Sequence, residues 1–306
     1  MAAEGVGLES KVELRPVLDR DVSAVAEFLH HHGADIGGQV APDVWAEAIV
    51  VPWGFSAPNR GFMLVCDDDV VGVYLAFYSE RLIGDAIVHV CNLATWYVAP
   101  EYRHHSIRLL RALLGQPGYH FTDLSPSEQV SKINRRLGFQ PLDSSRIRIR
   151  TLPWPSIPGR VRIVTKPKQI ERILTGTDLQ IYRDHASATA SLQLVVIRGE
   201  EVCHLIFRRS RPGRLRKSPF VKLLHVSNPD ILRKALRRVA RHLLVHYGTY
   251  EIRADFRVIK VRSGWGVKAH DSQKQRMFKS HLLAPEQVDY LYSELTHVNG
   301  MLNRVE

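Results

Sequence analysis

Four side chains that can bind an anion stand close together after one apolar segment. Arg103, His104, His105 and Arg108 follow residues 88–98, where polar residues alternate with β-forming ones. Helical spacing of leucines begins at once and continues to residue 114. The first N–H groups of a helix are unpaired, so a strand, a basic turn and a helix N-terminus together can bind phosphate. An ordinary turn with solvated basic side chains is the alternative that spacing leaves open.

Proline fixes where this strand must end. Pro100 has no N–H to donate to a sheet, so we expect the strand to stop at Ala99 and a polar turn to run from 101 to 106. The helix would then start near Ile107.

A resemblance to the GNAT superfamily of N-acetyltransferases is carried by residues 96–114, WYVAPEYRHHSIRLLRALL. Val98, Pro100, Tyr102 and Arg103 match the V-x-P-x-Y-R start of that family's acyl-coenzyme A loop. The chain departs from the pattern at Ser106 and Arg108, where the family has its two small residues. A second, weaker match is L-G-F at 137–139, after a helix.

The resemblance implies an acyl-coenzyme A-dependent N-acyltransferase with acetyl-CoA or another acyl-CoA as substrate. Trp96, Tyr97 and Val98 would then offer backbone groups to the pantetheine, and residues 103–108 would hold the pyrophosphate. These cofactor-binding candidates are Trp96, Tyr97, Val98, Arg103, His104, His105, Ser106, Ile107 and Arg108. The acceptor would be an amine, on a small molecule or a protein, whose identity stays open.

The catalytic positions of the family are poorly matched. Counting back from Gly138, the tyrosine that often serves as general acid falls on Asn134, which cannot donate a proton at neutral pH. His89, Asp85 and Asp123 lie on or near the predicted central strands and are the candidate general bases, although no spacing singles one out. Trp45 and Trp53 could contact substrate, but we assign both to the core.

Two other functions remain open on the sequence. Ser106, Arg108 and Asn134 would suit a non-catalytic binding or scaffolding protein on a degenerate acyltransferase fold. Nucleic-acid binding rests on charge alone, through the basic segment 208–217 and the helix after Asp230. That segment lacks the interleaved aromatic residues that stack on bases.

Charge divides the chain into two parts. Residues 1–159 carry 14 Lys and Arg against 18 Asp and Glu, whereas residues 160–306 carry 28 against 13. A proline-rich stretch lies between them. We therefore predict an α/β protein with two tandem GNAT-like domains, each a mixed twisted sheet flanked by helices: 11–152, a linker at 153–160, and a basic, divergent 161–306.

Several classes of site are not expected. Cys66, Cys91 and Cys203 have no ligand spacing and suggest buried free thiols. Three adjacent histidines, at 30–32, cannot all face one metal from a helix, so we predict no metal. The chain has no recognisable signal peptide and no apolar run of about 20 residues, so we expect a cytoplasmic protein without a membrane partner.

Overall fold

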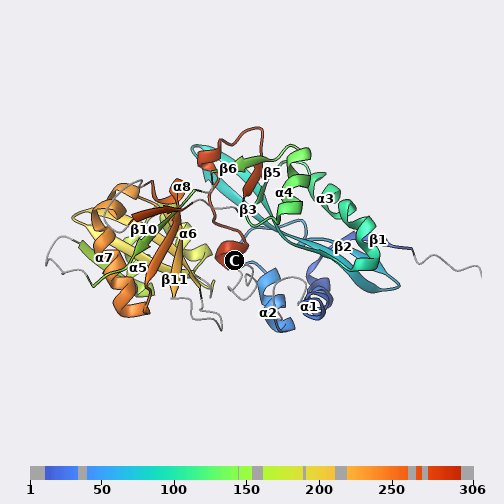
Figure 1. The fold of residues 1–306 in the computed structure, drawn as a ribbon, viewed down its shortest axis with the longest axis horizontal. Coiled ribbons are helices and arrows are strands. Elements are labelled where there is room, and N and C mark those ends of the chain that lie inside the picture. Colours follow the sequence, from blue (N-terminus) through green and yellow to red (C-terminus); the bar gives the residue numbers. More distant parts are fainter. Residues whose placement is uncertain are drawn as a thin grey trace, which may run out of the picture.

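The computed structural model describes residues 11–33, 40–143, 145–153, 161–188, 191–210, 219–260, 267–270 and 275–297. Two seven-stranded sheets lie beside one another along the long axis of the molecule, and helices flank each of them (Figure 1). Both sheets contain parallel and antiparallel pairs. The predicted α/β class with two mixed sheets is confirmed.

The first sheet has the strand order β1-β2-β3-β4-β5-β14-β6. Its strands are β1 (Glu13–Pro16), β2 (Gly61–Cys66), β3 (Asp69–Ile83), β4 (Ala86–Val98), β5 (Tyr119–Asp123), β14 (Arg276–Lys279) and β6 (Gln140–Leu142). Helices α1 (Val22–His31) and α2 (Pro42–Ile49) lie on one face, with α3 (Ser106–Leu114) and α4 (Glu128–Arg136) on the other (Figure 1). A short 3₁₀ turn, η1 (Asp19–Asp21), precedes α1.

Local sequence explains where these elements begin and end. The β2–β3 hairpin turns at Asp67 and Asp68, which both have positive φ, and aspartate tolerates that conformation better than most residues. Ser127 caps α4, because its hydroxyl accepts a hydrogen bond from the Val130 N–H at 3.2 Å. Gly138 then ends that helix region with a φ of 87°.

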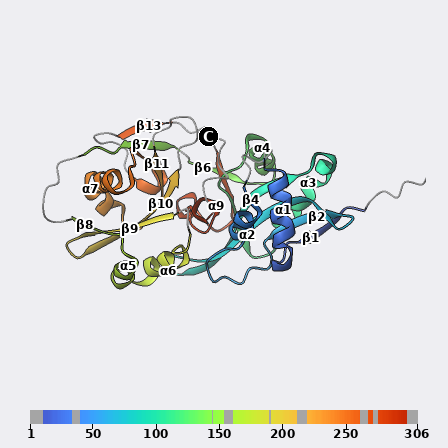
Figure 2. The same cartoon turned by 90° about the horizontal axis from the view of Figure 1, so that it is seen from below.

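The second sheet has the order β13-β7-β12-β11-β10-β9-β8. Its strands are β13 (Val267–His270), β7 (Arg146–Arg150), β12 (Glu251–Asp255), β11 (Phe220–Val226), β10 (Glu201–Ser210), β9 (Ser191–Arg198) and β8 (Val161–Val164). The long helix α7 (Pro229–Tyr247) covers one face, and α5 (Pro167–Ile173) and α6 (Gly176–Asp184) lie on the other (Figure 2). Short helices α8 (Phe256–Ile259), η3 (Pro285–Gln287) and α9 (Glu294–His297) complete the described elements.

The two sheets exchange strands. β7 precedes the predicted linker but pairs with β12 and β13 of the second sheet. β14 lies near the C-terminus but pairs with β5 and β6 of the first sheet. Sheet membership therefore does not follow the predicted division into 11–152 and 161–306. Most of the linker, from 154 to 160, lies outside the described residues. Independent folding of the two parts stays a prediction.

A buried ion pair joins the exchanged strands. Arg276 on β14 bonds the carboxylate of Asp255 at the end of β12, and the two side chains are 2% and 1% exposed. Arg146 on β7 lies 3.7 Å from the same carboxylate. A buried charge is tolerated only with a counter-charge at hand, so this contact fixes how the two sheets meet.

The three cysteines are buried and free, as predicted. Trp45 is buried in the core between α1, α2 and the first sheet, so its assignment to the core is also confirmed. No described helix is long and apolar enough to cross a membrane.

Candidate functional site

The first sheet opens between its two central parallel strands. β4 and β5 are paired from His89–Tyr119 to Leu93–Asp123, and there β5 ends while β4 continues to Val98. β4 also carries an extra residue at this point, because Tyr74 opposes Trp96 while Ala76 opposes Leu93. Such a bulge bends a strand away from its neighbour. The last residues of β4 are thus paired with β3 alone and leave one backbone edge without a strand partner.

The segment after β4 is more regular than the polar turn predicted for 101–106. Pro100–His105 forms a 3₁₀ helix, η2, that runs directly into α3 at Ser106. The Tyr102 N–H donates to the Ala99 carbonyl and the Ser106 N–H to the Arg103 carbonyl. N–H groups that a free helix N-terminus would offer to a phosphate are therefore used within the segment.

Its side chains still form an exposed basic surface. Arg103 and His104 are exposed, and neither side chain makes a hydrogen bond or ion pair with a described residue. The His105 ring lies 4.0 Å from that of His104, and burial, His104 and Arg108 lower its pKa. Arg108 instead donates to the Val12 carbonyl at 3.2 Å, which holds its guanidinium against the start of the chain.

The strand residues predicted to contact the cofactor are packed into the sheet. Trp96 stacks on Tyr74 with ring centroids 4.6 Å apart. Tyr97 and Val98 are buried, and the Tyr97 hydroxyl lies 3.1 Å from His32 Nδ1. Their backbone atoms lie on the part of β4 that is paired with β3 alone, and the backbone contact with a cofactor that the resemblance implies stays a prediction. Ile107 packs, half-buried, on the core under α3.

Asn134 and Asp123, two of the four residues weighed for catalysis, meet where β4 and β5 separate. Asn134 on α4 donates from Nδ2 to the Asp123 carboxylate at 2.8 Å, and the side chain of Tyr74 also hydrogen-bonds that carboxylate. Asp123 is 4% exposed. Burial and the nearby Glu294 raise its pKa to about 7, the range in which a carboxylate can accept and return a proton at neutral pH.

Glu294 reaches the same place from the C-terminal segment. Its carboxylate accepts from Asn92 Nδ2 at 2.5 Å and from the Ser125 hydroxyl at 2.6 Å. The Thr122 hydroxyl in turn donates to Asn92 Oδ1 at 3.0 Å. A buried carboxyl pair, Asp123 and Glu294, therefore marks the end of the paired part of β4 and β5.

The other base candidates lie elsewhere. His89 is paired with Tyr119, about 13 Å along the sheet from Asp123. Its Nε2 is 3.3 Å from Glu80, and its side chain is 44% exposed. Asp85 is exposed in the turn between β3 and β4. Neither contributes to the carboxyl pair.

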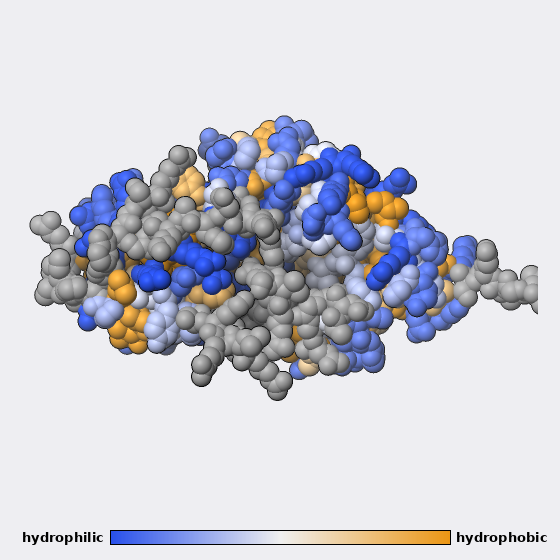
Figure 3. Space-filling view, viewed as in Figure 1, coloured by the Kyte–Doolittle hydropathy of each residue, from blue (hydrophilic) through white to orange (hydrophobic). Residues whose placement is uncertain are grey.

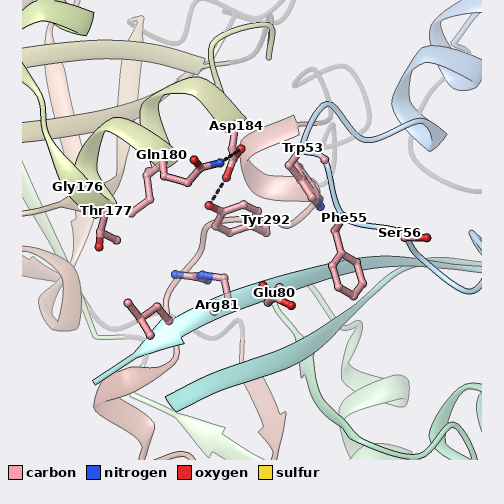
Figure 4. A pocket seen from close by; sticks show the side chains of 13 residues that line it. Trp53, Phe55, Ser56, Glu80, Arg81, Gly176, Thr177, Gln180, Asp184 and Tyr292 are labelled. Atoms are coloured by element: carbon pink, nitrogen blue, oxygen red, sulfur yellow. Dashed lines mark hydrogen bonds between the residues drawn. The ribbon is translucent and has the colours of Figure 1, made fainter. Parts of the chain in front are cut away.

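A cavity of about 670 Å³ opens between the two sheets. One wall is β3, with Glu80 and Arg81; the opposite wall is α6, with Asp184 (Figure 4). Trp53 and Tyr292 form an aromatic corner, with ring centroids 5.3 Å apart. Trp53 is thus a core residue that also lines a pocket. The further lining residues are Gly54, Phe55, Ser56, Leu82, Gly176, Thr177, Gln180 and Ile181.

The polar groups of this cavity are tied to the C-terminal segment. Tyr292 donates from its hydroxyl to Asp184 at 2.6 Å (Figure 4). Arg81 forms a double hydrogen bond with Asp289 and lies 4.6 Å over the Tyr292 ring. Tyr292 stands two residues before Glu294, so the Cα atoms of these two residues are at most about 7 Å apart.

Comparisons of the sequence and of the structure give different results. No protein-family model matches the sequence, and a search of curated protein sequences gives no match either. Solved structures do match. A GCN5-related N-acetyltransferase from Anabaena variabilis superposes with a TM-score of 0.58 at 13% identity, over 88% of this chain and 72% of that one. A second from Kribbella flavida gives 0.54 at 17% identity, over 88% and 71%.

The chain has the GCN5-related N-acetyltransferase (GNAT) fold. The resemblance inferred from residues 96–114 is thereby confirmed at the level of the superfamily fold. A yeast N-myristoyltransferase with bound myristoyl-CoA also matches, with a TM-score of 0.51 at 9% identity, over 90% of this chain and 84% of that one. At such identities the likeness concerns the fold.

The sequence did not indicate several members of this site. Glu294 and Tyr292 come from a C-terminal segment with little regular structure, and Asn92 was counted only as part of a strand. The buried position of Asp123 was the one available signal, since an aspartate at the end of an apolar strand is uncommon in a core. Pairing of the C-terminal segment with the first half of the chain is a tertiary feature of this GNAT-fold protein.

The two basic regions of the second half are the helix α7 and the segment 208–217. On α7, Arg233 pairs with Asp230 at 3.0 Å, and both side chains are exposed. The segment 211–218, the core of the predicted basic loop, lies outside the described residues. Hydrophilic side chains are spread over both halves of the face in Figure 3, with apolar residues scattered among them. Nucleic-acid binding gains no support from this arrangement.

Proposed function

We propose that this protein is an acyl-coenzyme A-dependent N-acyltransferase. The observation that carries the proposal is the separation of β4 and β5 after Leu93 and Asp123, with a buried carboxyl pair at the point of separation. A backbone edge without a strand partner can align an extended chain that carries amide groups, as the pantetheine of coenzyme A does. The match to GNAT-fold structures supports the same conclusion.

The residues along this path fit an acyl-CoA. The β4 edge beyond Leu93 leads to Arg103 and His104, whose free donors would hold a pyrophosphate by side chains. Backbone donors of η2 would contribute less, because that segment uses them internally. Ser106 and Ile107 begin α3 beside these side chains. The bound thioester would supply an activated acyl group.

Asp123 is the general base in this proposal. An amine is protonated at neutral pH and must lose a proton before it can attack a carbonyl carbon. A carboxylate with a pKa of about 7 can accept that proton, and Asn134 and Tyr74 hold it in place. The new C–N bond replaces the C–S bond, and the second proton that the nitrogen loses on becoming an amide is taken up by the departing thiolate. Asn134 is a positioning residue, which explains how an asparagine can stand where the family often has an acid.

The amine acceptor would enter through the cavity between the sheets. Glu80 and Asp184 supply negative charge there, and Trp53 supplies an aromatic ring that favours a cation. Arg81 is neutralised by Asp289 and does not repel a positive ligand. Tyr292 lies two residues before Glu294, so the chain leads from this cavity toward the carboxyl pair.

Binding and turnover can be tested separately. We expect acetyl-CoA to raise the melting temperature, since a ligand at about 100 times its Kd stabilises by about 2.7 kcal/mol. Release of free thiol in the presence of a panel of primary amines, with mass spectrometry of the products, would then show transfer. Absence of both a thermal shift and measurable heat of binding at millimolar acyl-CoA would contradict the proposal.

A second candidate function is supported by the η2 segment. Its internal hydrogen bonds and the contact of Arg108 with Val12 suit a degenerate fold that binds a partner without catalysis. Under this alternative acyl-CoA would not bind, and Arg103→Ala would change no ligand affinity. The binding experiment above therefore decides between the two functions.

A further inference from the structure

A group of metal-ligand side chains lies in the second half of the chain, outside the proposed catalytic site. Asp178 on α6, His204 on β10 and His225 on β11 each place one ligand atom within 4.8 Å of the others. Among the described residues this is the one such group of three or more His, Cys, Asp or Glu. The residues are far apart in the sequence, which is why spacing predicted no metal.

His204 and His225 lie on the same face of the second sheet. His204 and Ile206 share a face of β10, and Ile206 is the register partner of His225. A register shift at Ile206–Phe207 places Leu224 as an extra residue on β11, immediately before His225. Bulges of this kind re-aim a side chain. α6 crosses this face and brings Asp178 from its first turn.

Hydrogen bonds fix the tautomer of His204. Gln193 donates from Nε2 to the Tyr182 carbonyl at 3.3 Å, so its Oε1 faces His204 Nε2 at 2.8 Å. His204 therefore carries its proton on Nε2, and Nδ1 holds a bare lone pair. This Nδ1 is buried and has no hydrogen-bond partner. Metal-bound histidines are held in the same way, with the second ring nitrogen donating to a neighbouring oxygen.

The remaining two ligands are also without partners. His225 Nε2 is buried and unpaired. Asp178 is half-buried, and its carboxylate makes no hydrogen bond or ion pair with any described residue. Leaving such acceptors buried and unsatisfied costs free energy that a bound cation would recover.

We propose that Asp178, His204 and His225 bind a divalent transition-metal ion, for which Zn²⁺ is the best fit. Two imidazoles and one carboxylate are ligands that suit zinc. They do not suit Ca²⁺ or Mg²⁺, because these ions prefer shells made of oxygen atoms alone. Tetrahedral zinc with bonds near 2.1 Å needs ligand atoms about 3.4 Å apart, so ligand atoms that now lie within 4.8 Å of one another would approach by at most about 1.4 Å. The fourth position would hold water or a small anion.

The ion would fasten α6 to β10 and β11. α6 also supplies a wall of the cavity between the sheets through residues 176–184. His185, directly after α6, packs its ring 4.8 Å from Tyr292 and 5.7 Å from Trp53. Metal binding would therefore stabilise the cavity wall without taking part in acyl transfer, and the proposal does not depend on that activity.

Cobalt gives a direct test. The full chain, without an affinity tag and stripped with a chelator, would be titrated with Co²⁺ and then with Zn²⁺ against a chromophoric indicator. We expect one site per chain, visible d–d absorption of tetrahedral Co²⁺, and loss of that absorption when Zn²⁺ is added. Asp178→Asn and His204→Gln should each weaken binding by at least about 100-fold, since loss of an outer partner alone costs about 10–100-fold.

The matched control is the double change His242→Gln/His246→Gln, which removes another histidine pair, on α7, whose rings lie 4.3 Å apart. This double variant should bind Co²⁺ and Zn²⁺ at the Asp178, His204 and His225 site as tightly as the parent does. Asp178→Asn decides the matter if His204→Gln does not fold, because Asp178 is only half-buried on a short helix. The proposal is overturned if the parent shows no tetrahedral Co²⁺ spectrum, or if a folded Asp178→Asn variant binds as tightly as the parent.

Discussion

Neutralising Asp123 should change the pH dependence of stability in a defined direction. Its pKa is about 7 in the folded protein against an ordinary value of 3.8. The folded state therefore keeps this proton over a range in which the unfolded chain has lost it. That contribution to stability is complete below the ordinary pKa and is lost as the pH rises through about 7. A shift of about 3 units corresponds to about 4 kcal/mol at 1.36 kcal/mol per unit.

Asp123→Asn removes this titration while keeping the size of the side chain. We expect the free energy of unfolding of the variant, minus that of the parent, to rise by about 4 kcal/mol between about pH 4 and about pH 8 and then to level off. Buried histidines such as His185 have lowered pKa values and change stability in the opposite sense, but they occur in both proteins and cancel in the difference. Equilibrium urea denaturation across this pH range gives the two curves.

The exposed Asp85→Asn on the turn after β3 is the matched control and should give a flat difference. If the difference for Asp123→Asn is equally flat, or falls with pH, the raised pKa is wrong and so is the argument for a general base. If the variant behaves as expected, acyl transfer should drop by about 10²- to 10⁴-fold while acyl-CoA binding is kept, because a base acts on the reaction rather than on the cofactor.

Three further changes test other parts of the structure. Arg103→Ala should raise the Kd of acyl-CoA, measured by calorimetry, about ten- to a hundredfold without changing the melting temperature of the free protein. Arg111→Ala, at the other end of α3, is the control and should leave the Kd unchanged. Equal affinities of Arg103→Ala and the parent would show that Arg103 does not bind acyl-CoA. Asp255→Asn leaves Arg276 buried without its counter-charge and should lower the free energy of unfolding, measured by urea denaturation, by about 3–5 kcal/mol. A loss of less than about 1 kcal/mol would mean that the ion pair does not hold the exchanged strands together. Gly248→Ala should cost about 1–2 kcal/mol, because Gly248 ends α7 with a φ of 61°, and an unchanged urea midpoint would contradict this reason.

The local elements followed from sequence because their signals are local. The alternation at 88–98, the proline at 100 and the leucine spacing to 114 predicted a strand, its end and a helix, and all three are present. The helix predicted after Asp230 is α7, which Asn228 caps at its start and Gly248 ends. The acyltransferase resemblance of residues 96–114 gave the fold of the whole chain.

Contacts between distant segments were decided by the tertiary structure. β7 and β14 are short, and their sheet depends on which edge is open after the other strands have paired, which no local pattern encodes. Asp123 was one base candidate among three until burial and Glu294, a residue from the far end of the chain, raised its pKa. Asp178, His204 and His225 showed no ligand spacing, because a helix and two neighbouring strands bring them together only when the sheet has formed.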